Sequence, residues 1–264
     1  KYFAGEEFTV EEIQAALREN VEACKIAPVL MGSGPNVQGF NVLLQVLEKY
    51  FPSPESLESI GVDASTGEHF RAKYQSDKSL SAKIWKTIAD PFLGKYSLFK
   101  ICTGVLKANS EIYNVNKESM EKVGKLYLLR GNTPIEVPEL KSGDIGAVAK
   151  LNISETGDSI SVRNAPILYH GPKLSEPFTF MAYRAEQKAD EDKLSTALQK
   201  MMDEDRTIRL QADPENRQSL IYAIGEQQLE VLASRLKDRY NVSINLEKPR
   251  FAYRETIKKT VKVQ

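Results

Sequence analysis

The sequence predicts a multidomain protein in which an α/β remnant is followed by an antiparallel β-barrel and an α+β, ferredoxin-like unit. The first observation is a set of short β-rich runs separated by tight turns, which is typical of a barrel. They begin at Lys83 and continue to about Tyr169. The second is a change of period after residue 177, where strand and helix patterns follow in the order β-α-β-β-α-β of the split βαβ plan.

Residues 1–52 are expected to form the α/β remnant. Thr9–Arg18 is predicted to be a helix capped by Thr9, and Val37–Tyr50 a second helix. Between them, Ala27–Met31 is predicted to be a buried strand that turns out through Gly32-Ser33-Gly34-Pro35. The partner strands that such a unit needs are not visible in the sequence.

Residues 53–82 are rich in serine, proline, glycine and charge and show no sustained period, so we expect a linker there. His69 lies within it and is expected to be a solvated side chain. A second linker is expected over residues 171–177, which hold one glycine and two prolines. We expect the folds on either side of this second linker to move as separate bodies.

The barrel is expected over residues 83–170. In its first strand Ile84, Lys86 and Ile88 alternate with the residues between them, which is the pattern of a half-buried strand. Asp90-Pro91 interrupts that run, because proline cannot donate to a ladder, and Gly94 closes the turn. Further β segments are predicted at Tyr96–Thr103, Glu111–Asn114, Val123–Leu129, 142–148 and 156–160. Asp144 and Asp158, which lie in the last two, are interpreted as turn residues.

The ferredoxin-like unit is expected over residues 178–247, and residues 248–264 are expected to connect it to a following domain. Its two helices are predicted from apolar residues repeating at helical spacing, and they span Ala189–Glu204 and Glu226–Tyr240. Strands are predicted at Phe178–Ala182, Thr207–Gln211, Ser219–Ile224 and Val242–Leu246.

Several motifs along the chain, in order, resemble those of elongation factor G. Gly32-Ser33-Gly34 is similar to the last guanine-contacting loop of translational GTPases, with Gly34 in place of alanine. Asp90-Pro91 to Gly94 and the later Gly104-Val105-Leu106-Lys107 resemble the start of the family's barrel, with Asn109 where glycine is usual. Gly225-Glu226-Gln227-Gln228-Leu229-Glu230 resembles the start of a family helix, and Arg250–Ile257 matches the family's Val-Ala-Tyr-Arg-Glu-Thr-Ile segment. Gln228 stands where the family has histidine, and Arg206 where proline is usual, so we expect a divergent paralogue.

The resemblance implies a fragment of a GTPase. The intact protein is expected to bind GTP with magnesium, to hydrolyse it on the ribosome, and to couple hydrolysis to translocation or a related rearrangement. Gly32, Ser33 and Gly34 would contact the guanine side, and Glu226, Gln228 and Arg254 are candidates for interdomain or ribosome contacts. The alternative is a non-hydrolysing paralogue that docks on ribosomal RNA or protein. The expected partner is the ribosome, the small subunit in particular, and the expected state is a monomer.

This chain is itself expected to be catalytically inactive and to hold no metal or cofactor. It contains no Gly-x-x-x-x-Gly-Lys-Ser/Thr phosphate loop. Asn116-Lys117 is not followed by the aspartate of a guanine-reading Asn-Lys-x-Asp motif, because Ser119 occupies that position, so a polar turn is predicted. Asp190-Glu191-Asp192 is interpreted as the acidic first turn of a helix. No catalytic residue is predicted.

The totals exclude some classes of protein. The 36 basic and 36 acidic residues balance, so no field over the whole chain favours indiscriminate nucleic-acid binding. Cys24 and Cys102 lack metal-ligand spacing, and no apolar run suggests a membrane span; together these favour a cytoplasmic protein. A local basic cluster near the end could contact RNA or serve as a solvated connector; it contains Lys248, Arg250, Arg254, Lys258, Lys259 and Lys262.

Overall fold

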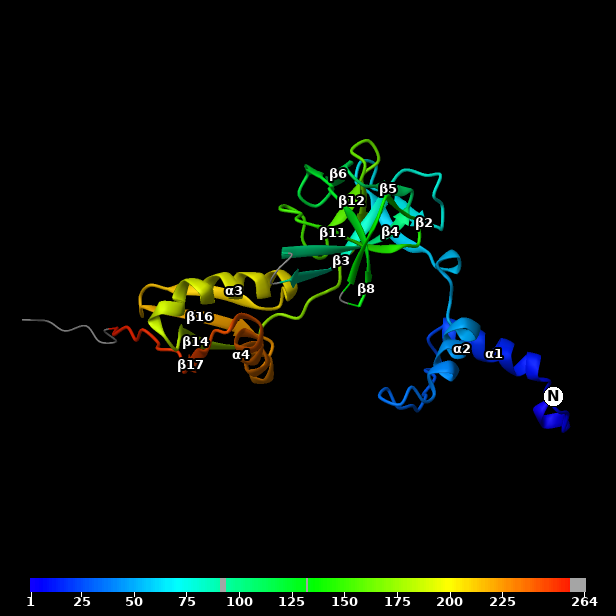
Figure 1. Cartoon of the computed structure of the whole chain (residues 1–264), viewed down its shortest axis with the longest axis horizontal. Coiled ribbons are helices and arrows are strands. Elements are labelled where there is room, and N and C mark those ends of the chain that lie inside the picture. The colour runs from blue at the N-terminus through cyan, green and yellow to red at the C-terminus, as the bar shows by residue number, and fades with distance from the viewer. Residues whose placement is uncertain (91–93, 132, 257–264) are drawn as a thin grey trace, which may run out of the picture. The chain divides into compact units, whose positions relative to one another are not determined.

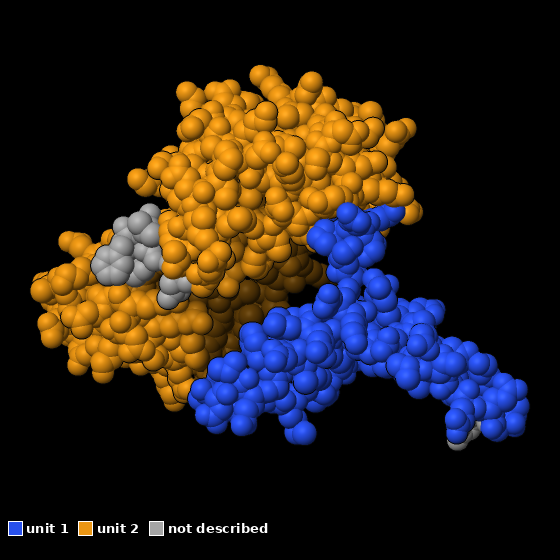
Figure 2. All heavy atoms as spheres, turned by 45° about the vertical axis from the view of Figure 1, so that its right-hand side comes forward, with its two compact units in different colours: residues 1–59 blue, residues 60–264 orange. Residues whose placement is uncertain are grey.

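The computed structural model describes residues 1–90, 94–131 and 133–256. Its residues group into two compact units, 1–59 and 60–264, shown in different colours in Figure 2. Figure 1 labels the helices and strands of both units. In the described part of the chain, no helix is both long enough and apolar enough to span a membrane.

The first unit is helical. It contains α1 (Val10–Glu22), α2 (Phe40–Tyr50) and two 3-10 turns at Tyr2–Ala4 and Pro54–Ser56. The predicted cap of α1 is confirmed, because the Thr9 hydroxyl accepts from the Glu12 amide at 3.3 Å and the Glu12 carboxylate accepts from the Thr9 amide at 3.0 Å. Both helices were expected from the sequence, with α2 beginning three residues later than predicted.

The prediction of a buried strand at Ala27–Met31 is wrong. No described residue before Ser59 lies in a strand, and Val29 and Met31 are 89% and 92% exposed. An apolar run forms a strand only when a neighbouring strand supplies hydrogen-bond partners, and this unit offers none among its described residues. The apolar composition was identified correctly, but the structure does not bury it.

The prediction that residues 53–82 form a linker is also wrong. Strands β1 (Ser59–Asp63) and β2 (His69–Ala72) lie there and form a three-stranded antiparallel sheet with β13 (Ile167–Tyr169) in the order β13-β1-β2. A small core of Ala72, Cys102, Ile167 and Tyr169 holds this sheet. These strands are short, and β1 finds its partner β13 about 100 residues away in sequence, so no local period marks them. His69 is exposed, as expected.

The predicted barrel is an antiparallel sheet of eight strands in the order β7-β6-β12-β3-β4-β11-β8-β9, with a separate pair β10-β5 (Figure 1). Its strands are β3 (Ser81–Asp90), β4 (Gly94–Thr103), β5 (Val105–Lys107), β6 (Glu111–Asn114), β7 (Ser119–Lys122), β8 (Leu126–Arg130), β9 (Thr133–Val137), β10 (Glu139–Lys141), β11 (Ile145–Ala149) and β12 (Ser159–Ser161). Fully buried side chains from many of these strands form one core, including Ile84, Phe99, Ile101, Leu106, Ile112, Leu126, Leu140 and Ile160. The turn predicted at Pro91 falls outside the described residues.

Strand β3 departs from the predicted alternation at Trp85. Ile84 pairs with Phe99 and Lys86 pairs with Leu98, so Trp85 is an additional residue on this strand, a β-bulge. After the bulge the inward phase shifts by one residue: Ile84 is buried, Trp85 and Lys86 are exposed, and Thr87 is buried. A bulge cannot be predicted from a pattern of period two, and the expected grouping of Lys86 with Ile84 is therefore wrong.

The turn roles predicted for Asp144 and Asp158 are confirmed. The Asp144 carboxylate accepts from the Lys141 amide at 2.7 Å, and the Asp158 carboxylate accepts from the Glu155 amide at 2.9 Å. Asp158 is 4% exposed and also accepts from the Asn114 side-chain amide at 2.8 Å. The contacts of Asp158 satisfy a buried carboxyl group with fixed donors, whereas Asp144 is exposed; in both cases the hydrogen bonds to nearby amides define the turn.

Glu121 fixes the segment that precedes Thr156. Its carboxylate accepts from the Ile153 amide at 3.0 Å, the Ser154 amide at 3.2 Å and the Ser154 hydroxyl at 2.7 Å, and it also accepts from the Asn152 amide. Successive backbone amides that point to one place form an anion-binding nest, and here the anion is a side chain of the same fold.

The ferredoxin-like fold follows the predicted order of elements. It consists of β14 (Thr179–Ala185), α3 (Glu191–Glu204, preceded by a 3-10 turn at Lys188–Asp190), β15 (Arg209–Asp213), β16 (Gln218–Ala223), α4 (Glu226–Tyr240) and β17 (Ile244–Glu247). The sheet order β15-β16-β14-β17 places the first and third strands at its centre, which is the ferredoxin-like arrangement. Apolar side chains of both helices pack with those of the sheet in one core, including Leu194, Leu198, Met201, Ile221, Leu229, Leu232 and Leu236. The bounds of α4 are those predicted.

Candidate functional site

The predicted guanine-side loop is a compact turn in the first unit. Ser33 and Gln38 exchange two backbone hydrogen bonds, from the Ser33 amide at 3.0 Å and from the Gln38 amide at 3.1 Å. A Cβ added at Gly32 would lie 2.7 Å from the Gln38 carbonyl oxygen, whereas one added at Gly34 would meet nothing within 4 Å. The loop therefore needs glycine at Gly32, and its departure from the family pattern at Gly34 has no steric consequence.

The other predicted site residues do not converge on one place. Glu226 is exposed at the first turn of α4, and Gln228 is half-buried two residues later. Arg254 lies elsewhere and makes an exposed ion pair with Glu215 at 3.1 Å. Ahead of it, Arg250 is held by two hydrogen bonds to the Gln218 side chain, at 2.8 and 2.9 Å. Lys258, Lys259 and Lys262 of the basic cluster lie outside the described residues.

Gln228 ties the beginning of α4 to the residues that follow α3. Its side-chain nitrogen donates to the Asp205 carboxylate at 2.9 Å and to the Thr207 hydroxyl at 2.8 Å. Its side-chain oxygen accepts from the Ile224 amide at 2.8 Å. Glu204, Asp205, Arg206 and Thr207 are called the junction loop below. Because the Gln228 amide uses both its donor and its acceptor sides, its orientation is fixed.

The junction loop also reaches the barrel. The Ala89 amide of β3 donates to the Glu204 carboxylate at 2.9 Å, and the Arg206 guanidinium donates to the Thr156 carbonyl oxygen at 2.7 Å. Arg206 also lies 3.4 Å from the Glu155 carboxylate. Beside these contacts is a cavity of about 500 Å³ lined in part by Lys117, Gly171 and Arg206.

Glu155 is the electrostatic centre of this junction. Partial burial alone would raise the pKa of its carboxyl. The hydrogen bond from Lys117 at 3.1 Å, with the positive charges of Lys117, Arg206 and Lys95, outweighs that effect and holds the pKa below its ordinary value. Glu155 therefore stays ionised, and attracts Arg206, down to acidic pH. The Asn116-Lys117 turn is part of this structure, since Asn116 accepts from the Ser159 amide at 2.7 Å, which confirms the predicted polar turn.

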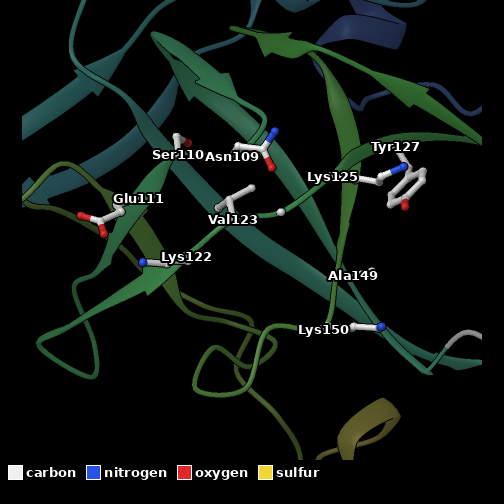
Figure 3. Close-up of a pocket in the computed structure, with 10 residues that line it drawn as sticks. Asn109, Ser110, Glu111, Lys122, Val123, Lys125, Tyr127, Ala149 and Lys150 are labelled. Atoms are coloured by element: carbon white, nitrogen blue, oxygen red, sulfur yellow. The ribbon is translucent and has the colours of Figure 1, made fainter.

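A basic groove lies on the barrel, and none of its described lining residues belongs to the junction loop. Figure 3 shows its lining, with Lys122, Lys125 and Lys150 around a hollow of about 810 Å³ and Glu111 as the acidic residue among the described lining. Lys125 is paired with Glu136 at 2.7 Å, and this hydrogen bond raises the pKa of its ammonium group. Tyr127 lines the same groove and packs edge-to-face on Tyr96, with ring centroids 5.8 Å apart.

Sequence reasoning did not identify the groove or the barrel side of the junction. The lysines of the groove come from separate strand ends, so only the fold brings them together. Thr156 begins the predicted segment 156–160, which was interpreted only as part of the barrel and its turns, and Glu155 carries no motif. Arg206 stood out only as a departure from proline. Asp190 pairs with Lys193 at 3.1 Å at the start of α3, and Glu191 and Asp192 lie in its first turn, in line with the helix-terminus interpretation.

Comparison with known proteins identifies the folds that carry these features. Residues 79–163 match the family described as "Elongation factor G domain 2", and residues 174–248 match the family described as "Elongation Factor G, domain III". A crystal structure of a protein from Thermus thermophilus superposes with a TM-score of 0.72 and 28% sequence identity, over 98% of this chain and 36% of that one. This chain thus spans about a third of the length of that protein. The barrel and the ferredoxin-like fold are elongation factor G domains in their family order, and the chain belongs to the elongation factor G-like family.

Proposed function

We propose that the intact protein is a ribosome-dependent GTPase that couples GTP hydrolysis to translocation or a related ribosome rearrangement. The observation that carries this proposal is the succession of elongation factor G domains 2 and III, preceded by the Gly32-Ser33 turn. Residues 1–52 are the end of its nucleotide domain. Gly32, Ser33 and Gly34 would lie at the guanine base, while the triphosphate and magnesium need a phosphate loop that this sequence does not contain.

The exposed apolar surface of the first unit supports this assignment. Of its described residues only Val21 is a buried apolar side chain, and large apolar side chains of α1 and α2 are exposed, Val10, Ile13, Phe40 and Leu44 among them. Such a surface needs a cover, which the rest of a nucleotide domain would provide.

We expect the small ribosomal subunit to be the partner of the barrel, through its basic groove. Lysines held around a hollow by strand ends can neutralise consecutive phosphates of an RNA backbone, and Tyr127 offers a ring for stacking. Since the whole chain has no net charge, this attraction is local.

The test of the groove is sedimentation of this chain with purified ribosomal subunits at several salt concentrations. The Lys122→Glu, Lys150→Glu double variant should lose most of its binding to the small subunit and show a shallower salt dependence. The control is Lys78→Glu, Lys86→Glu, which makes the same charge change at exposed lysines outside the groove. Equal loss in both variants would refute the groove, and no binding of the parent chain to either subunit would refute the partner.

The test of the nucleotide loop uses the intact protein and guanine-nucleotide binding. Gly32→Ala should weaken binding because its Cβ displaces a backbone carbonyl, whereas Gly34→Ala should leave binding unchanged. If both variants bind as the parent does, the loop is not at the base. The alternative function, a non-hydrolysing docking paralogue, predicts ribosome binding by the intact protein without ribosome-stimulated GTP hydrolysis.

A further inference from the structure

The junction loop has two sides with different partners. Glu204 and Arg206 reach the barrel, while Asp205 and Thr207 face Gln228 on α4. Glu204 is the last residue of α3, and Asp205 is extended at the helix C-cap. Arg206 and Thr207 then form a turn, in which the Ile208 amide donates to the Asp205 carbonyl oxygen at 3.3 Å, so this short stretch contacts both structures at once.

The contacts on the barrel side are charge-assisted and well placed. Glu204 is only 15% exposed, and its carboxylate is held by Arg239 at 3.1 Å while it accepts from the Ala89 amide. Arg206 donates to a backbone carbonyl oxygen and lies beside Glu155. An exposed ion pair alone contributes little, but hydrogen bonds between a charged group and the backbone are about twice as strong as neutral ones.

The contacts on the α4 side fix the backbone from which the Glu204 and Arg206 side chains extend. Gln228 bridges Asp205 and Thr207, and the Thr207 hydroxyl also donates to Asp205. Arg206 is the residue enclosed by this bridge. A change in the hydrogen bonding of Gln228 therefore moves the backbone from which Arg206 and Glu204 extend.

We propose that Gln228 is a positioning residue for an interdomain latch, in which it sets the junction loop so that Glu204 and Arg206 hold the barrel. The latch adds a specific contact to a connection of residues 171–177 that is otherwise largely exposed. The mutual orientation of the barrel and the ferredoxin-like fold is thus coupled to the first turn of α4. This inference concerns the two folds in this chain and stands independently of GTP hydrolysis.

Gln228 and Arg206, two of the positions at which this sequence departs from the pattern it resembles, both belong to the latch. Proline at position 206 would provide no donor for the Thr156 carbonyl. A histidine at position 228 could not reproduce a group that donates to two oxygens and accepts from an amide through one planar end. The latch is accordingly a property of this sequence.

The experiment is amide hydrogen exchange measured by NMR at Ala89, whose amide donates across the junction to Glu204. Gln228→Glu keeps the acceptor for Ile224 but removes the donor and places a second negative charge beside Asp205. We expect it to accelerate Ala89 exchange at least about fivefold, and Arg206→Ala to do the same. The matched control is Gln227→Glu, the same charge change at the preceding exposed residue of α4, which should leave Ala89 exchange unchanged.

Two further readouts separate a latch from a general loss of stability. Exchange at Ile221, in the core of the ferredoxin-like fold, should not change in either variant. Small-angle scattering should require more domain arrangements for Gln228→Glu than for the parent. The proposal is overturned if Ala89 exchange is unaffected, if Gln227→Glu has the same effect, or if Ile221 exchange rises in parallel with Ala89.

Discussion

Gly104 offers a measurable test of how closely the turn between β4 and β5 packs on the backbone that precedes β3. It joins β4 to β5 with a φ of +74°, and a Cβ added there would lie 2.7 Å from the Cα and amide nitrogen of Leu80 and from the Lys78 carbonyl oxygen. All three atoms are backbone, so no side-chain rotation can relieve the contact. Gly67 has the same φ of +74° with nothing within 4 Å of an added Cβ. The pair therefore separates conformational cost from steric cost.

The expected magnitudes follow from these two environments. A left-handed conformation costs alanine about 1–2 kcal/mol, part of which is offset by the reduced entropy of the unfolded chain. Gly67→Ala should therefore lower the free energy of unfolding by about 1 kcal/mol. Gly104→Ala adds the strain of forcing backbone apart in a packed fold, about 1–3 kcal/mol more, for a total of about 2–4 kcal/mol.

The assay is urea unfolding followed by the fluorescence of Trp85, the one tryptophan in the sequence, which lies in β3 and so reports on the barrel. With a urea dependence of about 2 kcal/mol per molar, the two variants should differ by about 0.5–1.5 M in midpoint. Equal midpoints for Gly104→Ala and Gly67→Ala would refute the steric reasoning. It would mean that the segment at Leu80 moves aside freely.

Four further predictions concern nucleotide binding by this chain and the properties of Glu155, Gln228 and Leu198. This chain should not bind a fluorescent GTP analogue in the micromolar range, since it contributes only the base-side loop, and such binding would contradict the assignment of residues 1–52. In an NMR titration the pKa of the Glu155 carboxyl should lie below its ordinary value of 4.5, and Lys117→Ala should raise it. Because the folded-state pKa is lowered, the contribution of Glu155 to folding stability is complete above pH 4.5 and is lost as the pH falls through the folded-state pKa. In the intact protein Gln228→His should introduce a pH dependence of ribosome-stimulated GTP hydrolysis between about pH 6 and 8, and identical profiles would remove Gln228 from the functional residues. Leu198→Ala, in a fully buried position, should destabilise the ferredoxin-like fold by about 2–5 kcal/mol by circular dichroism while the Trp85 transition stays in place; a shift of both transitions would show one cooperative unit.

The elements that could be predicted are those whose stabilising contacts are encoded locally. Helix α4 has the predicted bounds because its apolar residues recur at helical spacing up to Tyr240 and Asn241 ends it in a left-handed conformation. The strands β1 and β2 could not be found, because their stability depends on β13, far along the chain. The opposite error was made at Ala27–Met31, where a strand-like composition has no partner.

The candidate site divides in the same way. Gln228 was singled out by resemblance, but its task became visible only when the fold placed Asp205 and Thr207 beside it. The groove lysines had no sequence signal at all, since Lys122 and Lys150 are 28 positions apart by their numbers and meet only at strand ends. Side-chain clusters built from several strands need the register of the sheet, and the bulge at Trp85 shows how one additional residue changes that register.

The anion supplied by Glu121 has a consequence for the way the barrel meets its neighbours. Where a run of backbone amides becomes ordered only on binding an external phosphate, the ordering entropy reduces the affinity of each encounter. Here a carboxylate of the same fold accepts from the amides, so hydrogen bonds within the fold hold residues 152–154 without any partner. Glu155 and Thr156, which follow directly, are therefore presented to Arg206 as a preorganised surface.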